Sequence, residues 1–184
     1  MVASALLNNN LQKLSVVIPA RNEEHCIAAT IEHLYQELLT HSIPHEIIVI
    51  DDGSSDNTWN LLNKIQVTTP TLRPLQNEDT HGFGYAVLYG LGHMKGDAAA
   101  IVMADESDDC TDVTRYWEKL NEGYDCVFGS RFMNGSIVVD YHWFKYILNR
   151  LANSLIRFLF KLPFNDTTNA FKCYRKNVLD GCRP

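Results

Sequence analysis

The sequence lacks the features that mark several classes of protein. Its 16 Lys and Arg are outnumbered by 22 Asp and Glu, so at a net charge of −6 no overall basic surface for nucleic acid is expected. No uncharged run reaches the ~20 residues that a membrane-spanning helix needs. The start of the chain has no positively charged segment ahead of an apolar run, so we expect no signal peptide.

Paired cysteine motifs are also missing. The five cysteines contain no C-x-x-C pair, which predicts reduced thiols in a cytoplasmic protein rather than a disulfide framework. The sequence has no internal repeat, low-complexity tract or linker. At 184 residues it is long enough for one α/β domain, so we predict a single domain over residues 1–184.

One stretch organises the chain, Ile47 to Trp59, which reads Ile-Ile-Val-Ile-Asp-Asp-Gly-Ser-Ser-Asp-Asn-Thr-Trp. Its four β-branched apolar residues predict a strand buried on both faces, as in parallel sheets. Asp51 and Asp52 stand where that strand ends, and ligands of open α/β sheets bind beyond the carboxyl ends of the strands. Two acids there suit the donors of a ribose or base, or a metal held against phosphate. A helix cap with a solvated turn is the plainer alternative.

Strands and helices alternate along the rest of the chain. Strands are predicted at 15–19, 47–50, 72–76, 98–103 and 124–130, and helices at about 22–38, 58–66, 82–95 and 111–122. Asn22 is expected to cap the first of these helices. This alternation, with right-handed crossovers, predicts an α/β fold with a mostly parallel, Rossmann-like sheet flanked by helices.

Residues 141–162 predict a C-terminal amphipathic helix. One side is apolar and the other polar, although Tyr146, Ile156 and Phe160 fall toward the polar half. Such a helix either packs on the sheet, which is the commoner outcome, or lies on a membrane surface.

Polar residues follow three of the predicted strands, at 19–23, 51–53 and 104–108. Because the strands are parallel, these segments should converge on one crevice. Carboxylates, hydroxyls and turn N–H groups there suit a nucleotide diphosphate bridged by a hard divalent cation. Gly82 and Gly84 open the next helix, whose free N–H groups suit an anion or diphosphate, although a G-x-G alone usually marks only a turn.

These motifs resemble the inverting family 2 glycosyltransferases of GT-A fold, and most closely their dolichyl- and polyprenyl-phosphate mannosyl- or glucosyltransferase branch. The resemblance runs from Leu14 to about Leu179. It rests on six segments in the family's order: Val17-Ile-Pro-Ala-Arg-Asn-Glu23, Val49-Ile-Asp-Asp-Gly-Ser-Ser-Asp-Asn-Thr58, Gly82-Phe-Gly-Tyr-Ala86, Gly129-Ser-Arg131, Asn149-Arg-Leu-Ala-Asn153 and Asn165-Asp-Thr-Thr-Asn-Ala-Phe-Lys172.

The resemblance implies a nucleotide-sugar half at about 14–110 and an acceptor half at about 111–184. It implies transfer of a hexose from a UDP- or GDP-linked sugar to a polyprenyl or dolichyl phosphate, with inversion, Mg²⁺ or Mn²⁺, and peripheral contact at the cytoplasmic face of a membrane. The residues that would bind the nucleotide sugar are Pro19, Arg21, Glu23, Val49, Asp51, Asp52, Gly82 and Gly84.

The remaining implied roles concern metal, chemistry and acceptor. Asp105 would bind the metal, with Ser107, and is a candidate catalytic residue together with Arg131. Arg131 and Arg150 would bind the acceptor phosphate, because the planar guanidinium pairs with two phosphate oxygens. The nucleophile is then already anionic, so positioning and charge stabilisation matter more than a general base.

The sequence departs from the family at several positions. Met103 stands where the first acid of the family's D-x-D belongs, and methionine is a poor ligand for Mg²⁺ or Mn²⁺. Glu106, Asp108 or Asp109 could compensate, although the two aspartates also fit the start of the next helix. Arg21 stands where the family often has an aromatic residue, and it could reach a phosphate. The family continues beyond the last motif, which leaves open that this chain is a fragment.

Two other readings stay open. A sugar transferase with a soluble or saccharide acceptor would need a carboxylate base, for which Asp108 or Asp109 would serve. A non-catalytic nucleotide-sugar binding module would explain Met103, but it would need no acceptor arginines.

Overall fold

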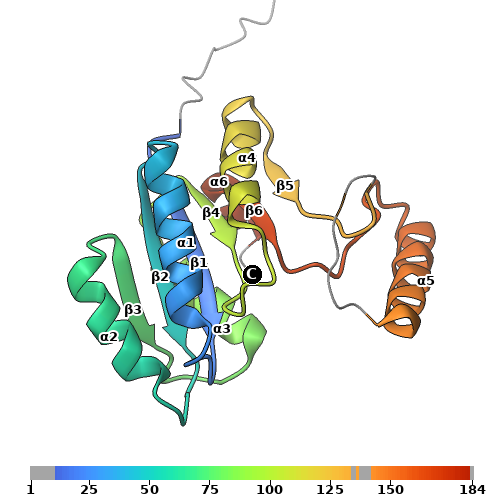
Figure 1. The fold of residues 1–184 in the computed structure, drawn as a ribbon. Coiled ribbons are helices and arrows are strands. Elements are labelled where there is room, and N and C mark those ends of the chain that lie inside the picture. The colour runs from blue at the N-terminus through green and yellow to red at the C-terminus, as the bar shows by residue number, and fades with distance from the viewer. Residues whose placement is uncertain (1–10, 134–135, 137–141, 183–184) are drawn as a thin grey trace, which may run out of the picture. The chain divides into compact units, whose positions relative to one another are not determined.

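The computed structural model describes residues 11–133, 136 and 142–182, and it contains one mixed sheet with helices on both faces (Figure 1). The strands lie in the order β3-β2-β1-β4-β6-β5. Their bounds are β1 Leu14–Ala20, β2 His45–Asp51, β3 Leu72–Gln76, β4 Ala98–Ile101, β5 Cys126–Phe128 and β6 Lys172–Arg175. Strands β1 to β4 pair in parallel and β6 pairs antiparallel with β4. The predicted α/β fold with a mostly parallel sheet is confirmed.

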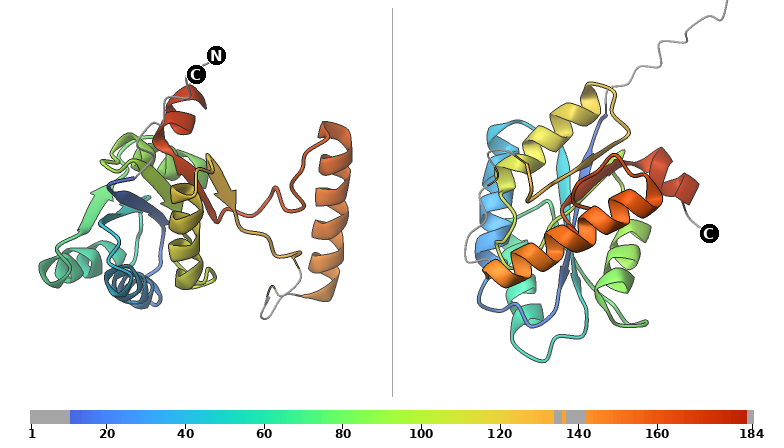
Figure 2. Two further views of the ribbon diagram at one scale, coloured as in Figure 1. Left: turned by 90° about the horizontal axis from the view of Figure 1, so that it is seen from above. Right: turned by 90° about the vertical axis from the view of Figure 1, so that its right-hand side faces the viewer.

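Helices cover both faces of the sheet, and the central residues of β1 (16–18) and β2 (47–50) are apolar and buried on both faces. Helices α1 (Ile27–Thr40), α2 (Thr58–Thr68) and α4 (Cys110–Asn121) pack on the face formed by residues such as Val16 and Val49. Helix α3 (Phe83–Gly92) packs on the opposite face, against Val17 and Ile48. Figure 2 shows these two layers of helices on either side of the strands.

Two further helices complete the list of elements, α5 (Trp143–Phe160) between β5 and β6 and α6 (Lys176–Cys182) after β6. The chain divides into two compact units, one of Met1–Val127 with Phe171–Pro184 and the other of Phe128–Ala170. The first unit holds the sheet and the second holds α5. The prediction of a single domain with two halves is not tested by this division and stays a prediction.

Several predicted boundaries differ from the structure. The first helix begins at Ile27 with Cys26 as its N-cap, so the predicted cap at Asn22 is wrong. Asn22 instead has a left-handed backbone (φ 58°), and its side-chain oxygen accepts a hydrogen bond from the backbone N–H of Ser55. Helix α3 ends at Gly92 rather than near Lys95. Strand β6 and helix α6 were not predicted.

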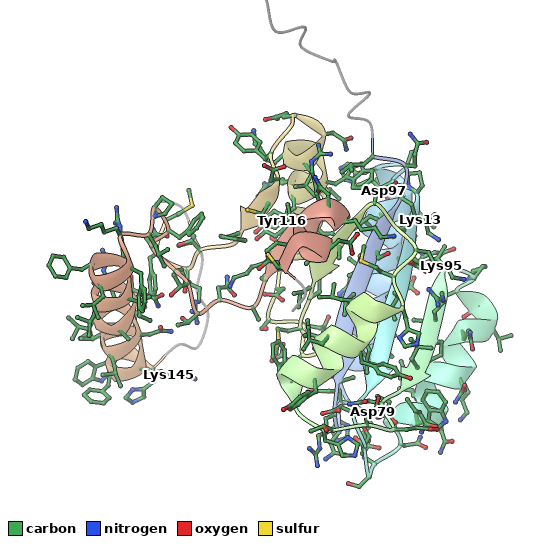
Figure 3. All side chains as sticks on the ribbon, turned by 180° about the vertical axis from the view of Figure 1, so that it is seen from behind. Lys13, Asp79, Lys95, Asp97, Tyr116 and Lys145 are labelled. Carbon is green, nitrogen blue, oxygen red and sulfur yellow. The ribbon has the colours of Figure 1, made fainter. Side chains whose placement is uncertain are left out.

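The two ends of the strands carry different residues. Lys13, Lys95 and Asp97 are labelled at one end and Asp79 at the other (Figure 3). The end near Asp79 is the one where β1 and β2 finish, and Ala20 pairs there with Asp51, which pairs in turn with Gln76. The carboxyl ends of these strands therefore meet at one edge, as predicted for a ligand site.

Candidate active site

Asp51 and Asp52 are both buried at this edge, but their surroundings differ. Asp51 is 2% exposed, and from the described residues its carboxylate accepts two hydrogen bonds, from Ser54 N at 3.2 Å and from Gln76 Nε2 at 3.5 Å, both at or beyond the long end of the usual range. A buried carboxylate with weak donors has acceptor capacity left for a ligand N–H or hydroxyl. This geometry is compatible with the predicted contact to the nucleotide.

Asp52 is instead held by the loop of residues 77–82. One oxygen accepts from Asn77 Nδ2 at 2.7 Å and lies 3.2 Å from His81 Nδ1, and the other accepts from the backbone N–H of Gly82 at 2.7 Å. Burial alone would raise the pKa of Asp52, but these hydrogen bonds outweigh it and hold the pKa below its usual value. Asp52 fixes the 77–82 loop, and its predicted role as a nucleotide ligand stays a prediction.

His81 was missed by the sequence analysis, because its place beside Asp52 and Gly53 comes from a contact between distant segments. Gly53 has φ 74°, and a Cβ added there would lie 3.0 Å from His81 Cε1. The positive φ therefore favours glycine at position 53, and a Cβ there would also press on the His81 ring. The half-exposed imidazole joins the turn after β2 to the loop before α3.

The two predicted glycines differ in what the structure requires of them. Gly82 is the N-cap of α3 and has φ 134°, a conformation that side-chain-bearing residues rarely adopt. At Gly84 an added Cβ would meet nothing within 4 Å, so packing does not require glycine there. Open space above a helix start leaves room for a ligand to approach the backbone.

The Pro19–Glu23 motif interlocks with the turn after β2. Asn22 N donates to Ser54 Oγ at 2.9 Å, and Glu23 N donates to Thr58 Oγ1 at 2.9 Å. Arg21 is exposed, whereas the side chains of Pro19 and Val49 are buried in strands. Any contact of Val49 with a nucleotide would therefore have to come from its backbone.

The segment after β4 carries the predicted metal site. Asp105 is exposed, and its Oδ1 accepts from Ser107 N at 3.1 Å. Burial raises the pKa of Glu23 above its usual value, and the negative charges of Asp105 and Asp56 raise it further. Negative charge therefore accumulates at this edge of the sheet.

The other acids of this segment have local structural contacts. Asp108 Oδ2 accepts from Met103 N at 2.8 Å, and Asp109 is the N-cap of α4, accepting from Thr111 N at 2.9 Å. Glu106 lies 2.9 Å from His33 Nδ1. Within the described ranges, no group of three or more His, Cys, Asp or Glu side chains could hold a metal ion by itself. The helix-start reading of Asp109 is confirmed, and compensation for Met103 by Glu106, Asp108 or Asp109 stays a prediction.

The predicted acceptor arginines both lie in the unit of Phe128–Ala170. The guanidinium carbons of Arg131 and Arg150 lie 5.7 and 5.8 Å from the centre of the Phe132 ring, so the structure brings them to one side chain. Arg131 also pairs with Asp166, which the sequence analysis quoted in a motif but gave no role. The predicted function of the two arginines is not tested by this geometry.

Helix α5 exposes most of its apolar residues. Among its 18 residues only Asn153 is buried, while Leu151, Phe158 and Leu159 are 63%, 80% and 62% exposed. None of the described helices is both long and apolar enough to cross a membrane. The expected contact with a membrane surface stays a prediction.

Comparison with known proteins places this geometry in a family context. Residues 15–182 match the model of the family described as glycosyl transferase family 2. A polyprenol monophosphomannose synthase of Mycolicibacterium smegmatis is 29% identical over 174 residues, which cover 92% of this chain and 64% of that protein. An undecaprenyl-phosphate 4-deoxy-4-formamido-L-arabinose transferase of Serratia proteamaculans is 27% identical over 174 residues, covering 92% of this chain and 51% of that protein. The chain thus spans about half to two thirds of the length of these relatives.

Solved structures show the same fold. Glucosyl-3-phosphoglycerate synthase from Mycobacterium tuberculosis, in complex with Mn²⁺, UDP and glucosyl-3-phosphoglycerate, aligns with a TM-score of 0.68 at 21% identity, covering 91% of this chain and 58% of that chain. A mannosyltransferase from Pyrobaculum calidifontis, in complex with GDP-mannose and Mn²⁺, aligns with a TM-score of 0.64 at 18% identity. The alignment covers 94% of this chain and 46% of that chain. At these identities the likeness concerns the fold alone.

Proposed function

The chain belongs to glycosyl transferase family 2, and from this premise we propose that it transfers a hexose from a UDP- or GDP-linked sugar to a polyprenyl or dolichyl phosphate, with inversion. The observation that carries the proposal is the family match over 15–182 together with two curated relatives whose names specify polyprenol- and undecaprenyl-phosphate products or substrates. Because the chain spans only part of each relative, activity, substrate and membrane contact are all part of the proposal.

The nucleotide would lie at the carboxyl ends of β1 and β2, where Asp51 O accepts a hydrogen bond from Asn77 N and where Glu23 follows β1. Asp51 would accept a hydrogen bond from an N–H or hydroxyl group of the base or ribose, since the hydrogen bonds that it accepts within the protein are long. The N–H groups at the start of α3 would face the diphosphate, which the positive end of a helix favours. Asp52 and His81 would act indirectly by fixing that loop.

The oxygen donors fit a hard divalent cation held jointly with the diphosphate. Asp105 offers an exposed carboxylate and Ser107 a hydroxyl, and the accumulated negative charge near Glu23 favours a cation. The protein would supply few ligands and the substrate the rest, a division usual for Mg²⁺ at phosphates. When bound, the cation would neutralise charge on the departing nucleoside diphosphate.

An anionic phosphate oxygen of the acceptor would attack the sugar carbon that bears the diphosphate. Arg131 and Arg150 would hold that phosphate, and no side chain has to remove a proton from it. The reaction then depends on positioning and charge stabilisation. The soluble-acceptor alternative would need Asp108 or Asp109 as base, but both already accept backbone hydrogen bonds.

We predict that the protein transfers sugar to polyprenyl phosphate in the presence of Mn²⁺, and that Asp105→Ala lowers the rate at least ~10²-fold, as loss of one electrostatic contact in a transition state does. The test titrates the protein with UDP-glucose and GDP-mannose, with and without Mn²⁺, and then measures turnover. Binding without turnover on any acceptor would favour the non-catalytic module, and full activity in excess EDTA would refute the metal role.

A further inference from the structure

The Arg131 guanidinium is held by hydrogen bonds before any ligand arrives. Its Nε donates to Asp166 Oδ2 and its Nη2 to Asp166 Oδ1, both at 2.8 Å. Nη2 also donates to Thr168 Oγ1 at 2.9 Å. Three guanidinium hydrogen bonds therefore go to two residues of one loop, and this bidentate geometry fixes the plane of the group.

Asp166 is built into the unit more firmly than a surface ion pair would be. Its side chain is 0% exposed, and it also accepts from the backbone N–H of Arg131 at 3.1 Å. Burial alone would raise the pKa of Asp166, but the hydrogen bonds from Arg131 outweigh it and hold the pKa low. The carboxylate is thus charged at neutral pH, and its geometry is set by side chain and backbone of the same arginine.

The same loop anchors the helix that carries Arg150. Asn153, the buried residue of α5, accepts from Thr167 N at 2.7 Å and donates to Thr168 Oγ1 at 3.1 Å. Arg150 lies one turn earlier on that helix. The loop 166–168 therefore contacts both the arginine after β5 and the helix of the second arginine.

Both guanidinium groups converge on one aromatic ring. Their carbon atoms lie within 6 Å of the Phe132 ring centre, a cation–π distance. Two cations near one side chain repel each other unless an anion lies close by. Asp166 supplies one negative charge, so the pair retains a net positive charge that suits a phosphate.

We propose that Asp166, with Thr168, is a positioning residue of the acceptor site. It holds Arg131 in the orientation in which Arg131 and Arg150 together receive the acceptor phosphate. This proposal rests on the proposed function. Its physical content is preorganisation: a guanidinium already fixed in place loses less conformational freedom when the phosphate binds.

The test measures steady-state kinetics of Asp166→Asn, which keeps the shape but removes the charge. We expect the KM for polyprenyl phosphate to rise at least about tenfold, with kcat at saturating lipid and the affinity for the nucleotide sugar nearly unchanged. A variant that only misfolds would instead lose kcat and nucleotide binding together. Thr168→Val, at an exposed position, is the milder second variant and should raise the same KM about threefold.

A double-mutant cycle shows whether Asp166 acts through Arg131. Arg131→Lys should raise the KM for the lipid phosphate. Adding Asp166→Asn to it should have no further effect on this KM, because the bidentate guanidinium that Asp166 positions is then absent. Asp112→Asn on α4 removes the same charge, from an exposed pair with Arg115, and should keep native kinetics. Additive effects in the cycle, or a native lipid KM for Asp166→Asn, would overturn the proposal.

Failure of the proposed function gives a different result. If the native protein transfers no sugar to polyprenyl phosphate, binding of farnesyl phosphate is measured by calorimetry, with farnesol as the control. Affinity for farnesyl phosphate that falls in Asp166→Asn would support the positioning role and refute the reaction. Equal affinity of native protein and variant for farnesyl phosphate would refute the positioning role.

Discussion

At the scale of the residue, the adjacent acids Asp51 and Asp52 differ in their hydrogen bonds. Both are buried at the end of β2. Asp52 accepts hydrogen bonds of 2.7 Å from the 77–82 loop, whereas those that Asp51 accepts from the described residues are 3.2 and 3.5 Å long. A sequence pattern treats the two as a pair, because it contains no information on which donors each side chain meets. The difference leads to opposite expectations for the two substitutions.

Asp52→Asn should lower the free energy of unfolding by about 1–3 kcal/mol at pH 7, the cost of leaving buried donors without their acceptor. The pKa of Asp52 is lower in the folded protein than in the unfolded chain, where it is ~4. Its carboxylate therefore contributes stability above that value, and the contribution is lost as the pH falls through the folded-state pKa. Urea denaturation at pH 7 and pH 3 measures the free energy of unfolding of native protein and variant. The difference between the two should be smaller at pH 3.

Asp51→Asn is the matched control for this experiment. It should change stability less than Asp52→Asn and should weaken nucleotide binding, measured by calorimetry. Equal losses of stability in both variants would show that the two acids are structurally equivalent, contrary to their hydrogen bonds.

At the scale of the element, helix α3 is fitted to the sheet through a glycine. A Cβ added at Gly90 would lie 2.5 Å from Ile50 Cδ1 and 2.6 Å from Val17 Cγ1, whereas one at Gly84 would meet nothing within 4 Å. Alanine normally stabilises a helix interior by about 0.5–1 kcal/mol relative to glycine. Overpacking costs about 1–3 kcal/mol.

Thermal or urea unfolding should therefore show that the same change, glycine to alanine, affects the free energy of unfolding differently at positions 90 and 84. Gly90→Ala should destabilise the protein by about 1–2 kcal/mol net of the helix gain, and Gly84→Ala should leave stability equal or higher. A stabilised Gly90→Ala variant would contradict the packing of α3 on β1 and β2.

The elements that sequence analysis predicted are those with a strong local signal. The β-branched run predicted β2 and the helical spacing predicted α1, although α1 begins at Ile27 rather than near Asn22. Strand β6 was missed because Lys172-Cys-Tyr-Arg175 has no such pattern, and its position comes from antiparallel pairing with distant β4. The Asn22 cap was wrong for the same kind of reason, since its side chain bonds to Ser55 on another loop.

At the scale of the whole molecule, the motifs located the carboxyl ends of the strands and the two arginines proposed to bind the acceptor, but not the residues that contact them. His81, Thr168 and the role of Asp166 emerge only from contacts between segments far apart in the chain. Family membership over residues 15–182 supports the reaction that these residues are proposed to serve.

The most direct test of the account is the structure of the reaction product. The native protein is incubated with α-linked UDP-glucose or GDP-mannose, Mn²⁺ and polyprenyl phosphate, and the product is analysed by mass spectrometry and NMR. The account predicts a hexosyl phosphate lipid whose sugar carbon is bonded to the phosphate oxygen in the β configuration. An α-linked product, or hexose found only on a hydroxyl acceptor or free in solution, would contradict inverting transfer to a lipid phosphate.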